Sequence, residues 1–264
     1  MIATSEHRLV ADSLREAQKT LKPIDPVSET YPTLDIDDAY AIQTLVIADR
    51  FDEGRVVRGY KVGLTSEAMQ RQLDVDQPDF GVLLDDMYIE GGTVVAASDY
   101  VSPKIEPEIA VILRSPLQGP GVTIVDVEDA VGTVVASLEV IDSRIRDWRI
   151  SIIDTIADNA SSAAVVLGST ELPLTAIDRH ALEVTLSINS VQAGHGTAAA
   201  VMGDPLAAVA WLANTLGERG VELPAGALIL PGSVCAAAAV APGDHVLADF
   251  GPLGTVSVTF SQEA

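Results

Sequence analysis

The first 52 residues carry apolar positions at the spacing of amphipathic helices. Within residues 5–20, one helical face is formed by Leu9, Val10, Leu14 and Ala17. Ser5 is placed to cap this helix, and Pro23 marks its end. A second helix is expected from Asp35 onward, because acids in a first turn interact favourably with the helix dipole. We therefore predict a helical N-terminal arm over residues 1–52 that packs on the main body.

From residue 53 onward the pattern changes to short apolar runs and period-two alternation, which predict strands. These runs cover residues 56–64, 103–113, 134–141, 182–188 and 254–260. The helices expected between them cover residues 66–73 and 205–220. Residues 142–148 and 155–162 are polar, and we expect loops held by side-chain hydrogen bonds there. The main body thus spans residues 53–264 and contains both strands and helices.

Composition limits the partners of this chain. Its 264 residues are 48% hydrophobic but only 4% aromatic, so the core is built from aliphatic side chains and alanine. The formal net charge of −22 repels nucleic acids and anionic membranes, and we expect neither as a partner. An anionic small substrate remains compatible with this charge, because a metal ion and a lysine reverse the sign locally.

Cysteine content and the N-terminal residues bear on the compartment. The single cysteine, Cys235, excludes an intrachain disulfide framework and a cysteine zinc cluster. Glu6 and Asp12 stand where a signal peptide is apolar, and no apolar run approaches 18 residues. We therefore expect a cytoplasmic protein. The chain also lacks the glycine-rich phosphate loop, the dinucleotide-binding glycine motif and the GxSxG nucleophile elbow.

Three glutamates within apolar strand-like runs suggest a metal site. On the strand over 103–113, Glu106 and Glu108 point to the same face, where two buried carboxylates repel each other. Glu139 is a single acid within the aliphatic run 134–141. Oxygen ligands of this kind suit Mg²⁺ or Mn²⁺. An edge strand whose glutamates face water is the commoner explanation of a lone Glu-x-Glu, but it does not explain Glu139, so a metal site is favoured.

Lys61 and Asp79 are candidates for proton transfer. Gly59, Lys61 and Gly63 share one strand face, and the two glycines leave room beside the ammonium group. The alternative is an exposed lysine that protects an edge strand from aggregation. Asp79 lies in a predicted loop before a short strand, where it is either a turn former or a general acid/base.

Five ordered motifs resemble one known family. They are Gly59–Ser66, Asp76–Gly81, Pro103–Ala110, Leu138–Trp148 and Ile156–Ser162. Together they resemble the 2-keto-4-pentenoate hydratase/4-oxalocrotonate decarboxylase family of the fumarylacetoacetate hydrolase superfamily, over essentially the whole chain. The resemblance implies an α+β fold, in which a mixed β-roll core forms the metal-binding catalytic domain (53–264) and carries an N-terminal helical arm (1–52).

The resemblance also implies roles for individual residues. Glu106, Glu108 and Glu139 match the carboxylates that hold Mg²⁺ or Mn²⁺, and Lys61 and Asp79 match the proton-transfer residues. The implied substrate contacts are Leu64, Phe80, Ser161 and Ser233. The pKa of Lys61 is expected to fall beside the cation and out of water. No cofactor besides the metal is expected.

The implied activity is the addition of water to 2-hydroxypenta-2,4-dienoate or a close homologue, in the meta-cleavage degradation of aromatic compounds. The residues of Arg144–Trp148 and of the Leu230–Ser233 loop resemble hydratases more closely than decarboxylases, so a hydratase is favoured. Decarboxylation of 4-oxalocrotonate is the alternative. A noncatalytic partner subunit is a third hypothesis, disfavoured by the intact glutamates, Lys61 and Asp79. Superfamily C–C hydrolases use a histidine, and none lies near these motifs. We expect a homo-oligomer that also associates with a pathway enzyme.

Overall fold

Two of the N-terminal helices begin directly after a residue whose side chain caps them. The structure is a computed structural model that describes residues 4–66, 70–71 and 74–262. Helix α1 (Ser5–Thr20) is capped by Thr4 and not by Ser5, since the Thr4 hydroxyl accepts from His7 N and the His7 ring accepts from Thr4 N. Helix α3 (Ile36–Asp52) was predicted from Asp35 onward, and the Asp35 side chain caps it by accepting from Asp38 N.

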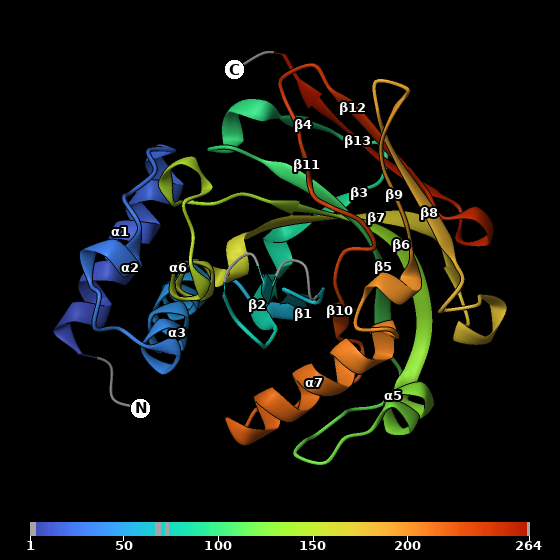
Figure 1. The fold of residues 1–264 in the computed structure, drawn as a ribbon, viewed down its shortest axis with the longest axis horizontal. Coiled ribbons are helices and arrows are strands. Elements are labelled where there is room, and N and C mark those ends of the chain that lie inside the picture. The colour runs from blue at the N-terminus through green and yellow to red at the C-terminus, as the bar shows by residue number, and fades with distance from the viewer. Residues whose placement is uncertain (1–3, 67–69, 72–73, 263–264) are drawn as a thin grey trace.

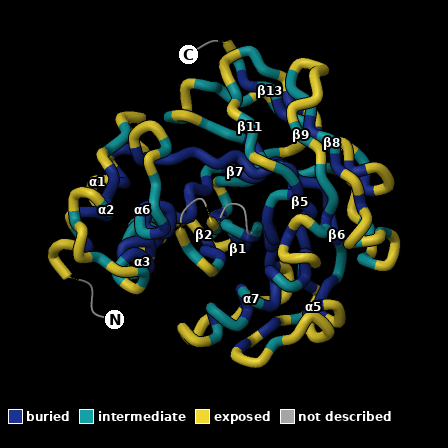
Figure 2. Tube along the Cα trace, viewed as in Figure 1, coloured by how far each residue is buried: buried dark blue, intermediate teal, exposed yellow. Residues whose placement is uncertain are grey.

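Helices α1, α2 (Val27–Thr30) and α3 lie together at one end of the molecule, next to α6 (Ile152–Ala157), as Figure 1 shows. Their buried faces join the main core, while their outer faces are exposed (Figure 2). Helix α6 is a correction to the sequence analysis, which expected a loop from residue 155. Ser151 caps this helix, and its apolar side chains face the arm and core. The arm boundary at residue 52 stays a prediction.

Over the described residues, the strands form two mixed sheets. The eight-stranded sheet has the order β2-β1-β10-β5-β6-β7-β3, with β11 pairing to β5. Its strands are β1 (Val57–Gly63), β2 (Asp79–Leu84), β3 (Tyr88–Glu90), β5 (Lys104–Leu113), β6 (Val131–Ile141), β7 (Ser162–Leu172), β10 (Leu228–Leu230) and β11 (Ala238–Ala239). The five-stranded sheet consists of β4 (Val94–Ala96), β13 (Thr255–Ser261), β12 (His245–Asp249), β8 (Glu183–Ile188) and β9 (Val191–Thr197), in that order.

The strongly curved pair β5 and β6 runs through the middle of the fold (Figure 1). Parallel pairs such as β1–β10 occur beside antiparallel ones such as β1–β2. One large hydrophobic cluster contains side chains of both sheets and of the helices. This architecture confirms the predicted α+β fold with a mixed β-roll core. The sequence analysis did not predict β7, β9 or β12. In β9, Gly194 and Gly196 conceal the strand pattern, and a Cβ at Gly196 would overlap the Val234 carbonyl.

Helices α5 (Ile124–Ala130) and α7 (Pro205–Glu218) pack together at the end of the fold nearest β10. Among the described residues, the segment Ala198–Glu218 is the one long and apolar enough for a membrane span, but 56% of its 18-residue apolar window is buried in the protein. Helix α7 is a core helix, because its apolar residues pack in the main cluster. The helix predicted over 66–73 falls largely outside the described residues.

Candidate active site

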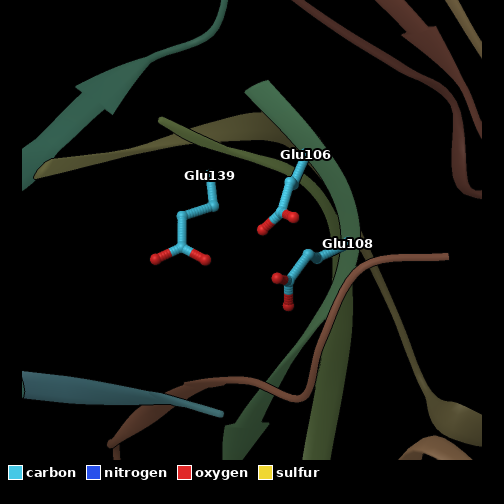
Figure 3. Close-up of side chains that lie close together, drawn as sticks. All are labelled: Glu106, Glu108 and Glu139. Carbon is cyan, nitrogen blue, oxygen red and sulfur yellow. The ribbon is translucent and has the colours of Figure 1, made fainter. Parts of the chain in front are cut away.

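Strands β5 and β6 bring the three glutamates together. Their antiparallel register places Glu106 directly opposite Glu139 and Glu108 opposite Ser137. One carboxylate oxygen from each glutamate lies within 4.8 Å of the other two. Figure 3 shows the three side chains converging on one space. Glu108 and Glu139 are buried and Glu106 is half-buried, so the edge-strand alternative is wrong.

The chemistry of this cluster fits a hard divalent cation. Glu108 Oε1 and Glu139 Oε1 are buried, and neither has a hydrogen-bond partner among the described residues. Glu108 Oε2 accepts a 2.7 Å hydrogen bond from Gly232 N. Burial raises the pKa of Glu106 to about 7, and burial together with repulsion from Glu139 raises the pKa of Glu108. Three converging carboxylates, whose negative charges need a nearby positive charge when they are ionised, fit Mg²⁺ or Mn²⁺.

Lys61 lies inside the sheet, because β1 is flanked by β2 and β10. Its side chain is 5% exposed, so the edge-lysine alternative is wrong. The ammonium Nζ donates to Ala160 O at 3.2 Å and lies 3.4 Å from Glu139 Oε2. Burial lowers the pKa of Lys61, but the carboxylates, led by Glu139, outweigh it and hold this pKa above its ordinary value. A cation bound to these carboxylates would neutralise their negative charge and so remove the cause of the raised Lys61 pKa.

Asp79 is the first residue of β2, and the prediction that it lies in a loop before the strand is wrong. It pairs with Gly63 across the β1–β2 register. A Cβ on Gly63 would overlap Asp79 Oδ1, so the room that this glycine leaves beside Lys61 is taken by the aspartate. The Thr155 hydroxyl donates to Asp79 Oδ2 at 3.1 Å. Burial raises the pKa of Asp79, and Lys61 opposes this rise.

The four residues predicted to contact substrate have different surroundings in the structure. Ser161 is buried next to Ala160, whose carbonyl receives Lys61, and its Oγ has no hydrogen-bond partner among the described residues. Ser233 follows Gly232, the residue that donates to Glu108, and its hydroxyl donates to the Cys235 carbonyl at 2.7 Å. Leu64 follows the last residue of β1 and has a φ of 56°. Phe80 stacks on Tyr40 of α3, with 4.5 Å between ring centroids. All four roles stay predictions.

The sequence analysis did not identify the turn that receives Lys61. Asn159, Ala160 and Ser161 have φ values of 55°, 51° and 54°, a run of left-handed residues that costs conformational energy. The Asn159 side chain holds this turn on β2, since it accepts from Val82 N at 2.8 Å and donates to Val82 O at 2.9 Å. The polar run 155–162 was visible in the sequence, but its backbone conformation was not.

We expect Asn159→Ala to lower the free energy of unfolding by about 2–4 kcal/mol, because it leaves two backbone groups of Val82 unpaired at a largely buried position. Asn189→Ala is the matched control: Asn189 also has a left-handed φ (52°) and hydrogen-bonds, but in an exposed turn. Urea unfolding of both variants measures the difference. Equal losses would show that the left-handed conformation, and not the Val82 contact, determines the cost.

Known proteins resemble this chain over almost its full length. The model of the fumarylacetoacetate (FAA) hydrolase C-terminal family matches residues 57–261. A 2-keto-4-pentenoate hydratase of Paraburkholderia xenovorans (strain LB400) is 42% identical over 250 residues, covering 95% of this chain and 93% of that protein. A 4-oxalocrotonate decarboxylase of Pseudomonas putida is 40% identical over 251 residues, 95% of each chain. The structure of a 4-oxalocrotonate decarboxylase from Pseudomonas putida G7, complexed with magnesium and adipate, has a TM-score of 0.95 at 36% identity and covers 98% of this chain and 99% of that chain.

Proposed function

The chain belongs to the fumarylacetoacetate hydrolase family, and we propose that it is a divalent-metal-dependent hydro-lyase. It adds water to 2-hydroxypenta-2,4-dienoate or a close homologue and forms a 4-hydroxy-2-oxo acid, in the meta-cleavage degradation of aromatic compounds. The observation that carries this proposal is the cluster of Glu106, Glu108 and Glu139, two of them buried and one half-buried, beside Lys61 and Asp79. The hydratase relative of 42% identity supports the choice of reaction.

The glutamates hold the cofactor in this proposal. Glu106, Glu108 and Glu139 would bind Mg²⁺ or Mn²⁺, which supplies Lewis-acid stabilisation of the negative charge that develops on the substrate. The relative complexed with magnesium supports this assignment. The backbone N–H of Gly232 keeps Glu108 oriented through its hydrogen bond to Oε2.

Lys61 and Asp79 move the protons. The first step is tautomerisation, in which the C2 hydroxyl proton leaves and C5 gains a proton, giving the 2-oxo-3-enoate. Lys61 transfers both protons: its ammonium group, which is buried and held between Ala160 O and Glu139, gives a proton to C5, and the resulting amine takes up the C2 hydroxyl proton. Water then adds its oxygen to C4 and its hydrogen to C3. Asp79, fixed by Thr155, orients or deprotonates that water.

The product distinguishes hydration from decarboxylation. Purified protein is incubated with Mg²⁺ and either 2-hydroxypenta-2,4-dienoate or 4-oxalocrotonate, and the product mass is measured. We expect the dienoate to gain one water, and 4-oxalocrotonate to be returned without loss of CO₂. Loss of CO₂ from 4-oxalocrotonate without hydration of the dienoate would assign the decarboxylase activity that one relative carries. A metal-binding chain that turns over neither compound would be a noncatalytic partner subunit.

A histidine-dependent C–C hydrolase is disfavoured by the contacts of the histidines. All four lie in the described part of the chain and hydrogen-bond away from the glutamates: His7 with Asp38, His180 with Gly203, His195 with Thr185 and His245 with Thr259. None of these contacts involves Lys61, Asp79 or a metal-binding glutamate. We therefore assign water activation in this proposal to Asp79 and not to a histidine.

We further propose that the protein is a cytoplasmic homo-oligomer that associates with a pathway enzyme. Leu9 of α1, Phe51 of α3 and Val56 before β1 are large apolar side chains that are exposed in the single chain. Apolar side chains of this kind are suited to a contact between subunits. Light scattering of the purified protein measures the oligomer size, and a monomer at micromolar concentration would contradict the proposal.

A further inference from the structure

The orientation of Asp79 depends on helix α6. Thr155 of α6 donates its hydroxyl to Asp79 Oδ2 at 3.1 Å, and both residues are buried. The other oxygen, Oδ1, lies against Gly63 next to Lys61. Asp79 thus has one oxygen held by α6 and one directed into the site. A shift of α6 relative to β2 moves the Thr155 hydroxyl and turns the carboxylate.

The N-terminal arm fixes α6 and β2 to each other. Gln43 of α3 is 3% exposed, and its side-chain Nε2 donates to Phe80 O at 2.8 Å and to Ile156 O at 3.1 Å. Phe80 follows Asp79, and Ile156 follows Thr155. A single amide group therefore joins the two backbone segments directly behind the two hydrogen-bonded side chains.

A second contact from the arm holds the first turn of α6. Ser28 of α2 donates from its backbone N at 3.1 Å and from its hydroxyl at 2.6 Å to the carboxylate of Asp154. Asp154 is fully buried and also accepts from Ser151, which caps α6. A buried polar group costs free energy unless it is hydrogen-bonded, and each of these groups has a hydrogen-bond partner. The arm thus contacts α6 by specific polar bonds on both sides of Thr155.

We propose that Thr155 of α6 and Gln43 of the N-terminal arm are positioning residues for Asp79. Thr155 sets the direction of the carboxylate, and Gln43 sets the spacing of α6 and β2 at that point. This inference rests on the proposed function for the role of Asp79. Misplacement of a reacting group by about 1 Å can lower a rate by about 100-fold, so such a contact acts on kcat.

Thr155→Val removes the hydroxyl and keeps the side-chain shape. We expect kcat to fall by about 10- to 100-fold, with KM changed by less than about two-fold and Mn²⁺ affinity unchanged. Thr155→Ser keeps the hydroxyl and should retain most of the activity. Thr44→Val is the control, because the Thr44 hydroxyl bonds only its own helix, to Tyr40 O, in the described structure. Normal kcat in Thr155→Val, or equal losses in the Ser and Val variants, would overturn the inference.

Gln43→Met tests the arm itself, with Gln18→Met on the exposed side of α1 as its control. We expect a loss of kcat of about 10-fold or more for Gln43→Met and none for Gln18→Met. Crystal structures of Thr155→Val and the unchanged protein give a readout independent of turnover: Asp79 should keep one conformer in the unchanged protein and rotate or split in the variant. If the unchanged protein turns over no dienoate, the proposed function fails, and an unmoved Asp79 in Thr155→Val separately overturns the positioning role.

Discussion

Lys61→Arg and Lys61→Ala are both expected to lower kcat by about 10²–10⁴-fold, the range for loss of a general acid/base. A lysine that only attracts the anionic substrate is replaceable by arginine, and its loss appears mainly in KM. A lysine that transfers protons is not replaceable, because a guanidinium group stays protonated at any working pH. The measurement is steady-state hydration of the dienoate for both variants.

Incorporation of solvent deuterium into the substrate measures tautomerisation separately from hydration. If Lys61 catalyses tautomerisation, deuterium exchange into the substrate slows in parallel with turnover in both variants. Lys19→Arg, on the exposed surface of α1, is the control for a lysine-to-arginine change and should behave as the unchanged protein. Near-normal kcat in Lys61→Arg would leave Lys61 as an electrostatic contact to substrate and Asp79 as the residue that transfers the proton.

Glu106→Gln and Glu139→Gln are expected to abolish both Mn²⁺ binding and activity while the fold survives. Burial raises the pKa of both glutamates, so their ionised forms are unfavourable in the folded chain. A neutral side chain of the same shape removes repulsion between paired positions of β5 and β6. The free energy of unfolding without metal should therefore be unchanged or higher for Glu106→Gln, but lower for Glu139→Gln, because that change also removes the buried ion pair with Lys61.

Calorimetric titration with Mn²⁺ measures the first effect, and thermal unfolding in EDTA measures the second. Glu171→Gln is the matched control, since Glu171 lies on the adjacent strand β7, is exposed, and accepts a hydrogen bond from Thr133. Unchanged Mn²⁺ affinity in both Glu106→Gln and Glu139→Gln would contradict the metal assignment. Activity lost with metal binding intact would instead assign these glutamates to chemistry on the substrate.

Local patterns predicted part of the secondary structure around the site. The apolar period of the first 52 residues predicted α1 and α3, although the first cap is Thr4 because His7 completes a capping box with it. Period-two alternation predicted that Glu106 and Glu108 share a face of β5, which depends only on the geometry of one strand. The motif resemblance identified the family over the whole chain, which the comparisons confirm.

Tertiary structure alone decided which of these residues meet. Glu139 faces Glu106 because of the register of β5 and β6, and Lys61 is buried because β1 lies between β2 and β10. Thr155 reaches Asp79 across 76 positions of sequence. Sequence periodicity encodes the direction of a side chain within its own element, whereas register, burial and contacts between distant elements depend on packing of the whole chain. The amino-acid sequence thus determined the candidate residues and their faces, and packing decided the site that they form.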